Sequence, residues 1–154
     1  MKTKLFIVTD LGHLRAYRKT LGINQQPHLE LMDELELDEA RTKRSALVSD
    51  QAGRFPQGIG SSTLHGAGSA SERLHVEQEH ERRLIRQLAN KIDALVSDPE
   101  VILCHLAVSE AIRNQLLEAI HPEARGKIHH VLTADLTGIP TESLLEHFEL
   151  AECK

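Results

Sequence analysis

Apolar residues near the start of the chain follow the short-period pattern of β-strands. Leu5-Phe6-Ile7-Val8 is a continuous apolar run, which is typical of a strand buried on both faces. A turn at Asp10-Leu11-Gly12 and the alternating residues 14–18 predict that the next strand returns beside the first. The chain is therefore expected to begin with an antiparallel hairpin.

The segment from Leu29 to Leu37 fits two kinds of structure. Its leucines at 29, 31, 35 and 37 fall on one strand face at a period of two, although Asp33 interrupts the stripe. Leucine and glutamate also favour helices. We predict a third strand here and a possible fourth at Ala46-Leu47-Val48.

The second half of the chain alternates between helical and strand patterns. Ser69 and Glu72 fit a capping box, and apolar residues from Leu84 to Val96 then recur at the helical period. The remaining expected elements are a strand at 101–106, a helix from Ser109, a strand at 128–133 and a helix from Thr141. Helices between successive strands require parallel pairing. The prediction is a single α/β domain over residues 1–154. Its mixed sheet has antiparallel hairpin strands first and strand–helix crossovers afterwards.

Between these halves the periodic pattern stops, from about residue 51 to residue 71. Five glycines, Pro56 and several serines in this stretch cannot build a core and favour a flexible loop. A loop of about twenty residues inside a compact domain is uncommon and is usually functional or disordered. The helix that follows is almost wholly polar from Glu72 to Arg83. This predicts an arm that projects beyond the core, with the loop at its tip.

The loop region is locally basic on an acidic chain. The net charge of −5 argues against a protein that binds nucleic acid over its whole surface, and three Phe with one Tyr supply no platform for base stacking. Between residues 41 and 71, however, Arg41, Lys43, Arg44 and Arg54 are opposed by Asp50 alone. Such a patch can hold a phosphate backbone, although ordinary surface charge gives the same pattern.

Ten histidines suggest a metal site. His75 and Glu79 lie four residues apart on the predicted helix, with His65 as a third candidate. No Cys-x-x-Cys or His-Glu-x-x-His spacing supports them, and the pair is explained equally well as exposed helix neighbours. We expect no metal and no small-molecule cofactor.

Catalytic motifs are also missing from the sequence. Cys104 lies in a predicted buried strand, where a thiol is inert, and the loop serines lack a Gly-x-Ser-x-Gly elbow. An ester or phosphodiester hydrolase could instead use Asp50 and His65 as base and orienter, with Arg54 as a clamp. The alternative is that these three residues close a turn and face solvent.

The cysteines and the N-terminal pattern bear on the compartment. Cys104 and Cys153 are the whole supply of thiols, and the first apolar run is only four residues long. A reducing compartment is then expected, without a signal segment, a membrane span or a membrane partner. We expect a cytoplasmic protein.

Four short motifs lie in order along nearly the whole chain. They are Leu47-Val48-Ser49-Asp50-Gln51-Ala52-Gly53-Arg54, His65, residues 107–117, and Asp135-Leu136-Thr137 with Pro140. Together they resemble the bacterial host-attachment protein family, whose corresponding stretches read LVSDRPGR, Arg-His-Ala, APP…L…L and KDLT..P. The chain departs from these stretches at Gln51-Ala52, Val108-Ser109 and Ala134, where the family has Arg-Pro, Pro-Pro and Lys.

That family is similar to the middle domain of eukaryotic and archaeal class 1 release factors and of pelota. The resemblance implies an α/β fold with a loop leading into a long helix, and the ribosome or tRNA as partner. In release factors this loop bears Gly-Gly-Gln, which helps place a water on the peptidyl-tRNA ester. Gly66, Ala67 and Gly68 stand at the corresponding positions here. Because the Gln is missing, we do not expect peptide release.

Three hypotheses follow from the sequence. The first is a non-catalytic binding module, associated with RNA or the ribosome, whose candidate residues are Arg41, Lys43, Arg44, Asp50, Gly53, Arg54, His65, Gly66 and Gly68. The second is the small hydrolase. The third is a protein-interaction role in the attachment of bacteria to host cells, which the family's name suggests.

Overall fold

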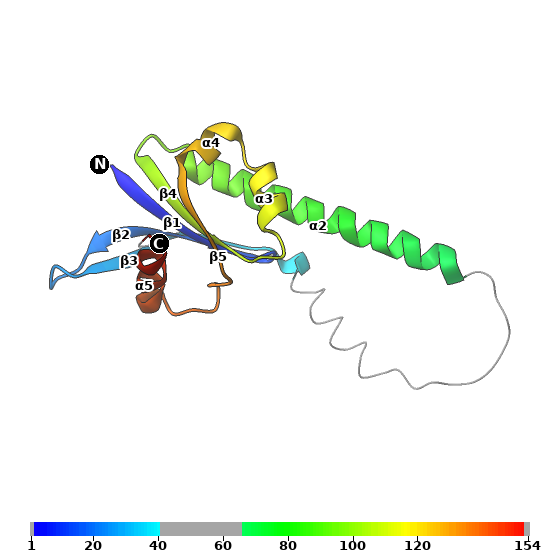
Figure 1. Ribbon diagram of the computed structural model, residues 1–154, viewed down its shortest axis with the longest axis horizontal. Coiled ribbons are helices and arrows are strands. Elements are labelled where there is room, and N and C mark those ends of the chain that lie inside the picture. Colours follow the sequence, from blue (N-terminus) through cyan, green and yellow to red (C-terminus); the bar gives the residue numbers. More distant parts are fainter. Residues whose placement is uncertain (1, 41–65, 153–154) are drawn as a thin grey trace.

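One mixed sheet organises the computed structural model, which describes residues 2–40 and 66–152 (Figure 1). Its strands are β1 (Thr3–Thr9), β2 (His13–Leu21), β3 (Pro27–Glu36), β4 (Val101–Val108) and β5 (Ile128–Thr133). They lie in the order β3-β2-β1-β4-β5. The β1–β2 and β2–β3 pairs are antiparallel, whereas β1–β4 and β4–β5 are parallel. The predicted fold class is confirmed.

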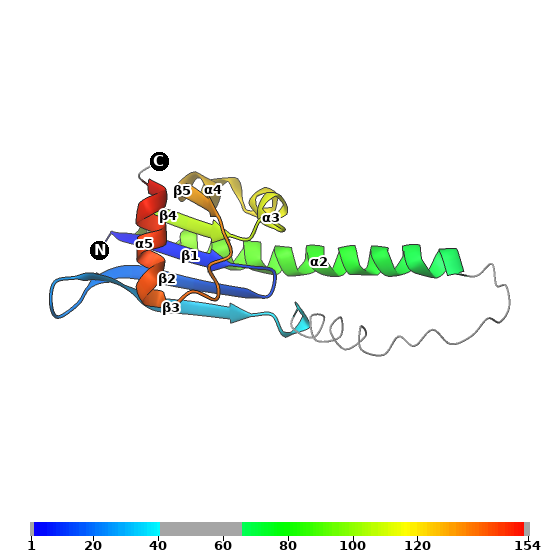
Figure 2. The same ribbon diagram turned by 60° about the horizontal axis from the view of Figure 1, so that its bottom comes forward.

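Helices cover both faces of this sheet (Figures 1 and 2). They are α2 (Gly66–Val96), α3 (Arg113–Ala119), α4 (Pro122–Lys127) and α5 (Thr141–Glu152). The first three pack on one face, where they share a hydrophobic core with the sheet. Of the helices described, only α5 packs on the opposite face, where it forms a second, smaller core with the sheet.

The central strand β1 connects the two cores. Leu5 and Ile7 lie in the core under α2, whereas Phe6 and Val8 lie in the core under α5. All four side chains are buried. Successive residues of a strand point to opposite faces, so a strand covered on both sides must be apolar throughout. This explains why the run appears continuous rather than alternating.

The β3 strand forms as predicted, but its leucines do not share one face. The register with β2 shifts between Ala16 and Tyr17, which face Asp33 and Leu31 and leave Met32 as the extra residue of a bulge. Beyond a bulge of one residue, each side chain of the strand points to the opposite face of the sheet from the one that strict alternation predicts. Leu29 accordingly packs under α5, whereas Leu35 packs under α2.

The helix boundaries differ from the prediction in three places. α2 begins at Gly66, so residues 66–71 belong to the helix rather than to the loop, and Ser69 is not its cap. α3 begins only at Arg113, because Ser109 starts a turn in which its carbonyl accepts a hydrogen bond from the Ile112 amide at 3.3 Å. The sequence pattern does not predict α4, a short helix with Pro122 in its first turn.

Candidate functional site

The predicted binding residues divide into two groups. Seven of them lie outside the described residues, as does the predicted strand at 46–48: Arg41, Lys43, Arg44, Asp50, Gly53, Arg54 and His65. Gly66 and Gly68 lie at the start of α2 and not in a loop, so the tip expected before the helix is itself helical there. The hydrolase arrangement of Asp50, Arg54 and His65 stays a prediction.

The N-terminal part of α2 projects away from the sheet, as the polar sequence predicts (Figures 1 and 2). Residues 71–79 are all exposed, and the first fully buried side chain is Leu84. We call residues 66–83 the arm. At 1.5 Å per residue the arm is roughly 27 Å long. Because its side chains from 71 to 79 face solvent, that stretch adds little to the hydrophobic core.

Charge is distributed unevenly along the arm and its base. Glu77 and Glu79 lie in the middle of the arm, whereas Arg82, Arg83 and Arg86 gather where α2 enters the core, and all three arginines are exposed. Arg82 forms an ion pair with Glu79 over 3.4 Å. Arg83 and Arg86 form no ion pair within residues 2–40 and 66–152. At the base of the arm, Arg83 and Arg86 are therefore exposed guanidinium groups outside the ion pairs that the described residues form.

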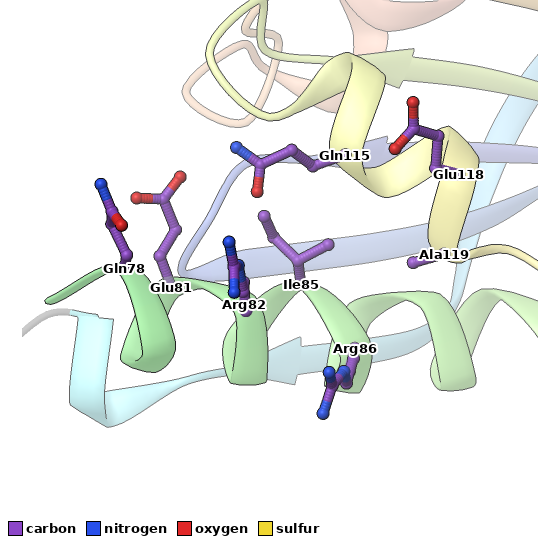
Figure 3. A pocket seen from close by; sticks show the side chains of 8 residues that line it. All are labelled: Gln78, Glu81, Arg82, Ile85, Arg86, Gln115, Glu118 and Ala119. Atoms are coloured by element: carbon purple, nitrogen blue, oxygen red, sulfur yellow. The ribbon is translucent and has the colours of Figure 1, made fainter. Parts of the chain in front are cut away.

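A pocket of about 560 Å³ lies between α2 and α3 at the base of the arm (Figure 3). Its walls carry two guanidinium groups, two amides and two carboxylates, from Arg82, Arg86, Gln78, Gln115, Glu81 and Glu118, with Ile85 and Ala119 completing the lining. In Figure 3, Gln78 and Glu81 rise from α2 and Gln115 extends from α3, whereas Arg86 points away from them. The pocket offers hydrogen-bond donors and acceptors without an excess of either charge.

A second polar region lies where β1 ends. Asp10 is buried, and its Oδ1 accepts a hydrogen bond from the Gly12 amide at 2.8 Å. The Thr137 hydroxyl lies 3.2 Å from Asp10 Oδ2 and 2.6 Å from Asp135 Oδ1, so it can donate its one hydrogen to either carboxylate. Arg15 donates to the Thr137 carbonyl at 3.3 Å. The Asp135-Leu136-Thr137 motif thus fastens the loop before α5 to the end of β1.

Leu136 also holds this loop in place, through apolar packing. It is buried in the core under α5, beside Leu144 and Phe148. The motif therefore combines two polar anchors with one apolar anchor. The sequence pattern singles out these three residues but gives no sign of their partner Asp10, which lies 127 positions away.

The acidity of Glu34 and of Cys104 is changed by their surroundings. The hydrogen bond from Arg15, followed by that from His13, holds the pKa of Glu34 below its usual range. Burial raises the pKa of the Cys104 thiol to about 12. A thiol with that pKa is almost wholly protonated at neutral pH and is a poor nucleophile, as the position of Cys104 in a buried strand predicts.

His75 and Glu79, the metal ligands considered from the sequence, both lie on the exposed arm. Within the described ranges they belong to no group of three convergent ligands, and His65 lies outside those ranges. None of the helices described is long and apolar enough to cross a membrane.

These features define a small α/β protein with a mixed sheet, two unequal cores and a charged helical arm. The chain belongs to the family described as "Protein required for attachment to host cells", which matches residues 5–148. No curated protein matches the chain.

Two solved structures show partial likeness to the fold. One is the crystal structure of a Ppx/GppA phosphatase from Aquifex aeolicus, with 16% identity, a TM-score of 0.43, and coverage of 86% of this chain and 36% of that one. The other is an archaeal protein, with 10% identity, a TM-score of 0.39, and coverage of 98% and 40%. The chain thus spans well under half the length of either structure.

Proposed function

We propose that the chain is a non-catalytic binding module that contacts ribosomal RNA or tRNA through the base of the arm and the basic segment before it. The observation that carries the proposal is the pair of exposed guanidinium groups, Arg83 and Arg86, which form no ion pair with the described residues. A guanidinium group can form two parallel hydrogen bonds with a phosphate, so exposed arginines suit the backbone of a nucleic acid.

The position of these arginines supports the proposal. A helix that leaves the core contributes little to folding beyond that point, so its length is better explained by contact with a partner. Arg82 and Arg86 line the pocket between α2 and α3, where Gln78 and Gln115 add amide groups. Arg41, Lys43, Arg44 and Arg54 precede α2 in sequence. These four residues are a local excess of positive charge in the sequence of an otherwise acidic chain, which favours local rather than general phosphate binding.

The resemblance of the sequence to the middle domain of release factors suggests the ribosome or tRNA as the partner. In release factors a glycine-containing loop precedes a long helix, and Gly66 and Gly68 stand at the start of α2 here. We infer that the arm approaches the ribosome or tRNA without carrying out ester hydrolysis, because no Gln follows Gly66-Ala67.

Ribosome co-sedimentation tests the proposal. The wild-type chain is compared with two triple variants and a control that loses the same charge elsewhere. The variants are Arg82/Arg83/Arg86→Ala, Arg41/Lys43/Arg44→Ala and, as control, Arg18/Lys19/Arg125→Ala. The wild type and the control should bind at low salt, and each lost phosphate contact should reduce the salt slope by about 1. Absence of wild-type binding at low salt, or equal loss in the control, would overturn the proposal.

The description of the family favours a second function, a protein contact in attachment to host cells. Leu74 and Val76 are 59% and 69% exposed on the arm, and exposed apolar side chains of this size suit a protein partner. A Leu74/Val76→Ser variant distinguishes the two functions. It should retain RNA binding if arginines carry the contact and lose attachment if the apolar residues do.

A further inference from the structure

One imidazole and two carboxylates converge at the edge of the sheet where β2 begins and β3 ends. His13, the first residue of β2, lies directly opposite Glu36, the last residue of β3. Glu34 is two residues before Glu36 and faces Arg15. Residues two apart on a strand share a face, as do residues directly opposite on paired strands. The pairing therefore places all three side chains on one side of a two-stranded ribbon.

The three side chains are close enough to bind one ion. His13 Nε2 lies 2.6 Å from Glu34 Oε1 and 3.7 Å from Glu36 Oε1. One ligand atom from each residue lies within 4.8 Å of the other two. Ligand atoms around one tetrahedral zinc ion are about 3.3–3.6 Å apart, as bond lengths of about 2.0–2.2 Å require. Side-chain rotations that move the ligand atoms by less than about 1.5 Å would bring them to that spacing.

The charges at this edge favour a cation. Arg15 Nε, 2.8 Å from Glu34 Oε1, is the guanidinium partner of one carboxylate. Glu36 has only His13 as its ion-pair partner among the described residues. Two more carboxylates, those of Asp10 and Asp135, contact the Thr137 hydroxyl. Arg15 donates a hydrogen bond to the carbonyl of the same threonine. Arg15 is thus the ion-pair partner of Glu34 alone among these carboxylates.

We propose that His13, Glu34 and Glu36 form a binding site for a divalent transition-metal ion of the Zn²⁺ type. An imidazole nitrogen with two carboxylates is a donor set suited to zinc and its neighbours, whereas Mg²⁺ and Ca²⁺ prefer oxygen ligands alone. Three protein ligands leave a fourth position for water or a substrate atom. The ligands are 20%, 37% and 56% exposed, so an ion can enter without unfolding of the sheet edge.

The site is tested on the full chain, stripped with a chelator and titrated with Zn²⁺ in a calorimeter, with Mg²⁺ as a parallel titrant. The chain carries ten histidines, so each variant needs a matched control. His13→Ala is compared with His28→Ala. The imidazole of His28 lies on the same pair of strands and is hydrogen-bonded to the Thr20 hydroxyl. Glu36→Gln is compared with Glu30→Gln, whose carboxylate pairs with Arg18. Thermal unfolding of each apo variant verifies that the chain still folds.

The wild type should bind one Zn²⁺ and no Mg²⁺ in the same concentration range. Removal of a ligand should lower the zinc affinity at least about 100-fold, since loss of a group that only hydrogen-bonds to a metal ligand already costs about 10–100-fold. The His28 and Glu30 controls should stay within about threefold of the wild type. The proposal is overturned if wild-type chain does not bind zinc, if His13→Ala and Glu36→Gln bind as the wild type does, or if the controls lose affinity equally. Equal Mg²⁺ binding would also overturn it.

Discussion

At the scale of single residues, Thr137 gives the Asp135-Leu136-Thr137 motif its hydrogen bond to another part of the chain. It lies between two carboxylates and reaches the buried Asp10 across 127 positions of sequence. Asp10 keeps its second hydrogen bond, from the Gly12 amide. Thr137 thus links two loops that the strand pairing alone would leave independent.

The first prediction follows from this link. Thr137→Val keeps the shape of the side chain but removes the hydroxyl from a buried carboxylate, so the free energy of unfolding should fall by about 1–3 kcal/mol. Urea denaturation measures the change. Thr133→Val, on an exposed position of β5, is the matched control and should alter stability by less than about 0.5 kcal/mol. An unchanged midpoint for Thr137→Val would contradict the role assigned to the hydroxyl.

Cys104 gives a prediction about pH. Burial raises its pKa to about 12 in the folded chain, whereas an unfolded cysteine has a pKa of about 8.5. The folded state therefore binds the proton more tightly, and its stabilising contribution is fully present below about pH 8.5. The contribution should decrease as the pH rises from there towards 12.

Thiol labelling measures the burial of Cys104, which is the cause of its raised pKa. In a Cys153→Ser variant, whose single thiol is Cys104, a disulfide reagent at pH 8 should label the native chain only as fast as the chain unfolds. Labelling should be complete at once in denaturant. Rapid labelling of the native chain would contradict the burial of Cys104.

At the scale of elements, α2 combines two kinds of helix in one. Its C-terminal part buries Leu84, Leu88 and Ile92 in the larger core, whereas residues 71–79 of the arm are wholly exposed. Most helical stability in proteins comes from tertiary packing rather than from intrinsic propensity. The two parts should therefore differ in how often their backbone hydrogen bonds open.

Hydrogen exchange tests this difference. Amides of residues 84–96 should exchange near the global unfolding rate, whereas those of residues 72–79 should exchange orders of magnitude faster. Substitution should follow the same division. Leu84→Ala should lower stability by about 2–5 kcal/mol, and Leu74→Ala, on the arm, by less than about 0.5 kcal/mol. Uniform protection along α2 would indicate that the arm is packed against something in solution.

A third prediction at this scale concerns the β2–β3 pair. The Arg15 hydrogen bond and the His13 contact lower the pKa of Glu34, so the ionised form is favoured by folding. The stabilising contribution of Glu34 is present above its unfolded pKa of about 4.3 and is lost as the pH falls through the lower folded value. The difference in unfolding midpoint between wild type and Glu34→Gln should then shrink below pH 4. A constant difference across that range would contradict the assignment.

At the scale of the whole molecule, the sequence predicts the layered architecture well. The strands at β1, β2, β4 and β5 are recognised because their apolar residues are close in sequence and their burial follows a short period. The polar stretch from Glu72 to Arg83 correctly predicts an arm. The sequence pattern within a segment therefore predicts a strand or helix wherever that segment's own residues determine its conformation and burial.

The errors have the opposite origin. The facing of Leu29 and Leu35 depends on the bulge at Met32, which arises from pairing with β2 and leaves no mark in the sequence of β3 alone. The grouping of His13 with Glu34 and Glu36 depends on the same pairing across the hairpin. Metal-ligand spacing within one helix, as at His75 and Glu79, is visible in sequence, whereas ligands brought together by strand pairing are not.

Among the strands that the structure describes, β3 lies outermost, and this position has a consequence for behaviour at high concentration. An edge strand presents unpaired backbone groups to which another chain can add, and this is a common route to aggregation. Here the edge carries Glu30, Asp33, Glu34 and Glu36 and is interrupted by the bulge at Met32. Two copies meeting edge to edge would bring rows of carboxylates together across a kinked strand. The irregularity that moves Leu35 into the larger core therefore also helps to keep the copies apart.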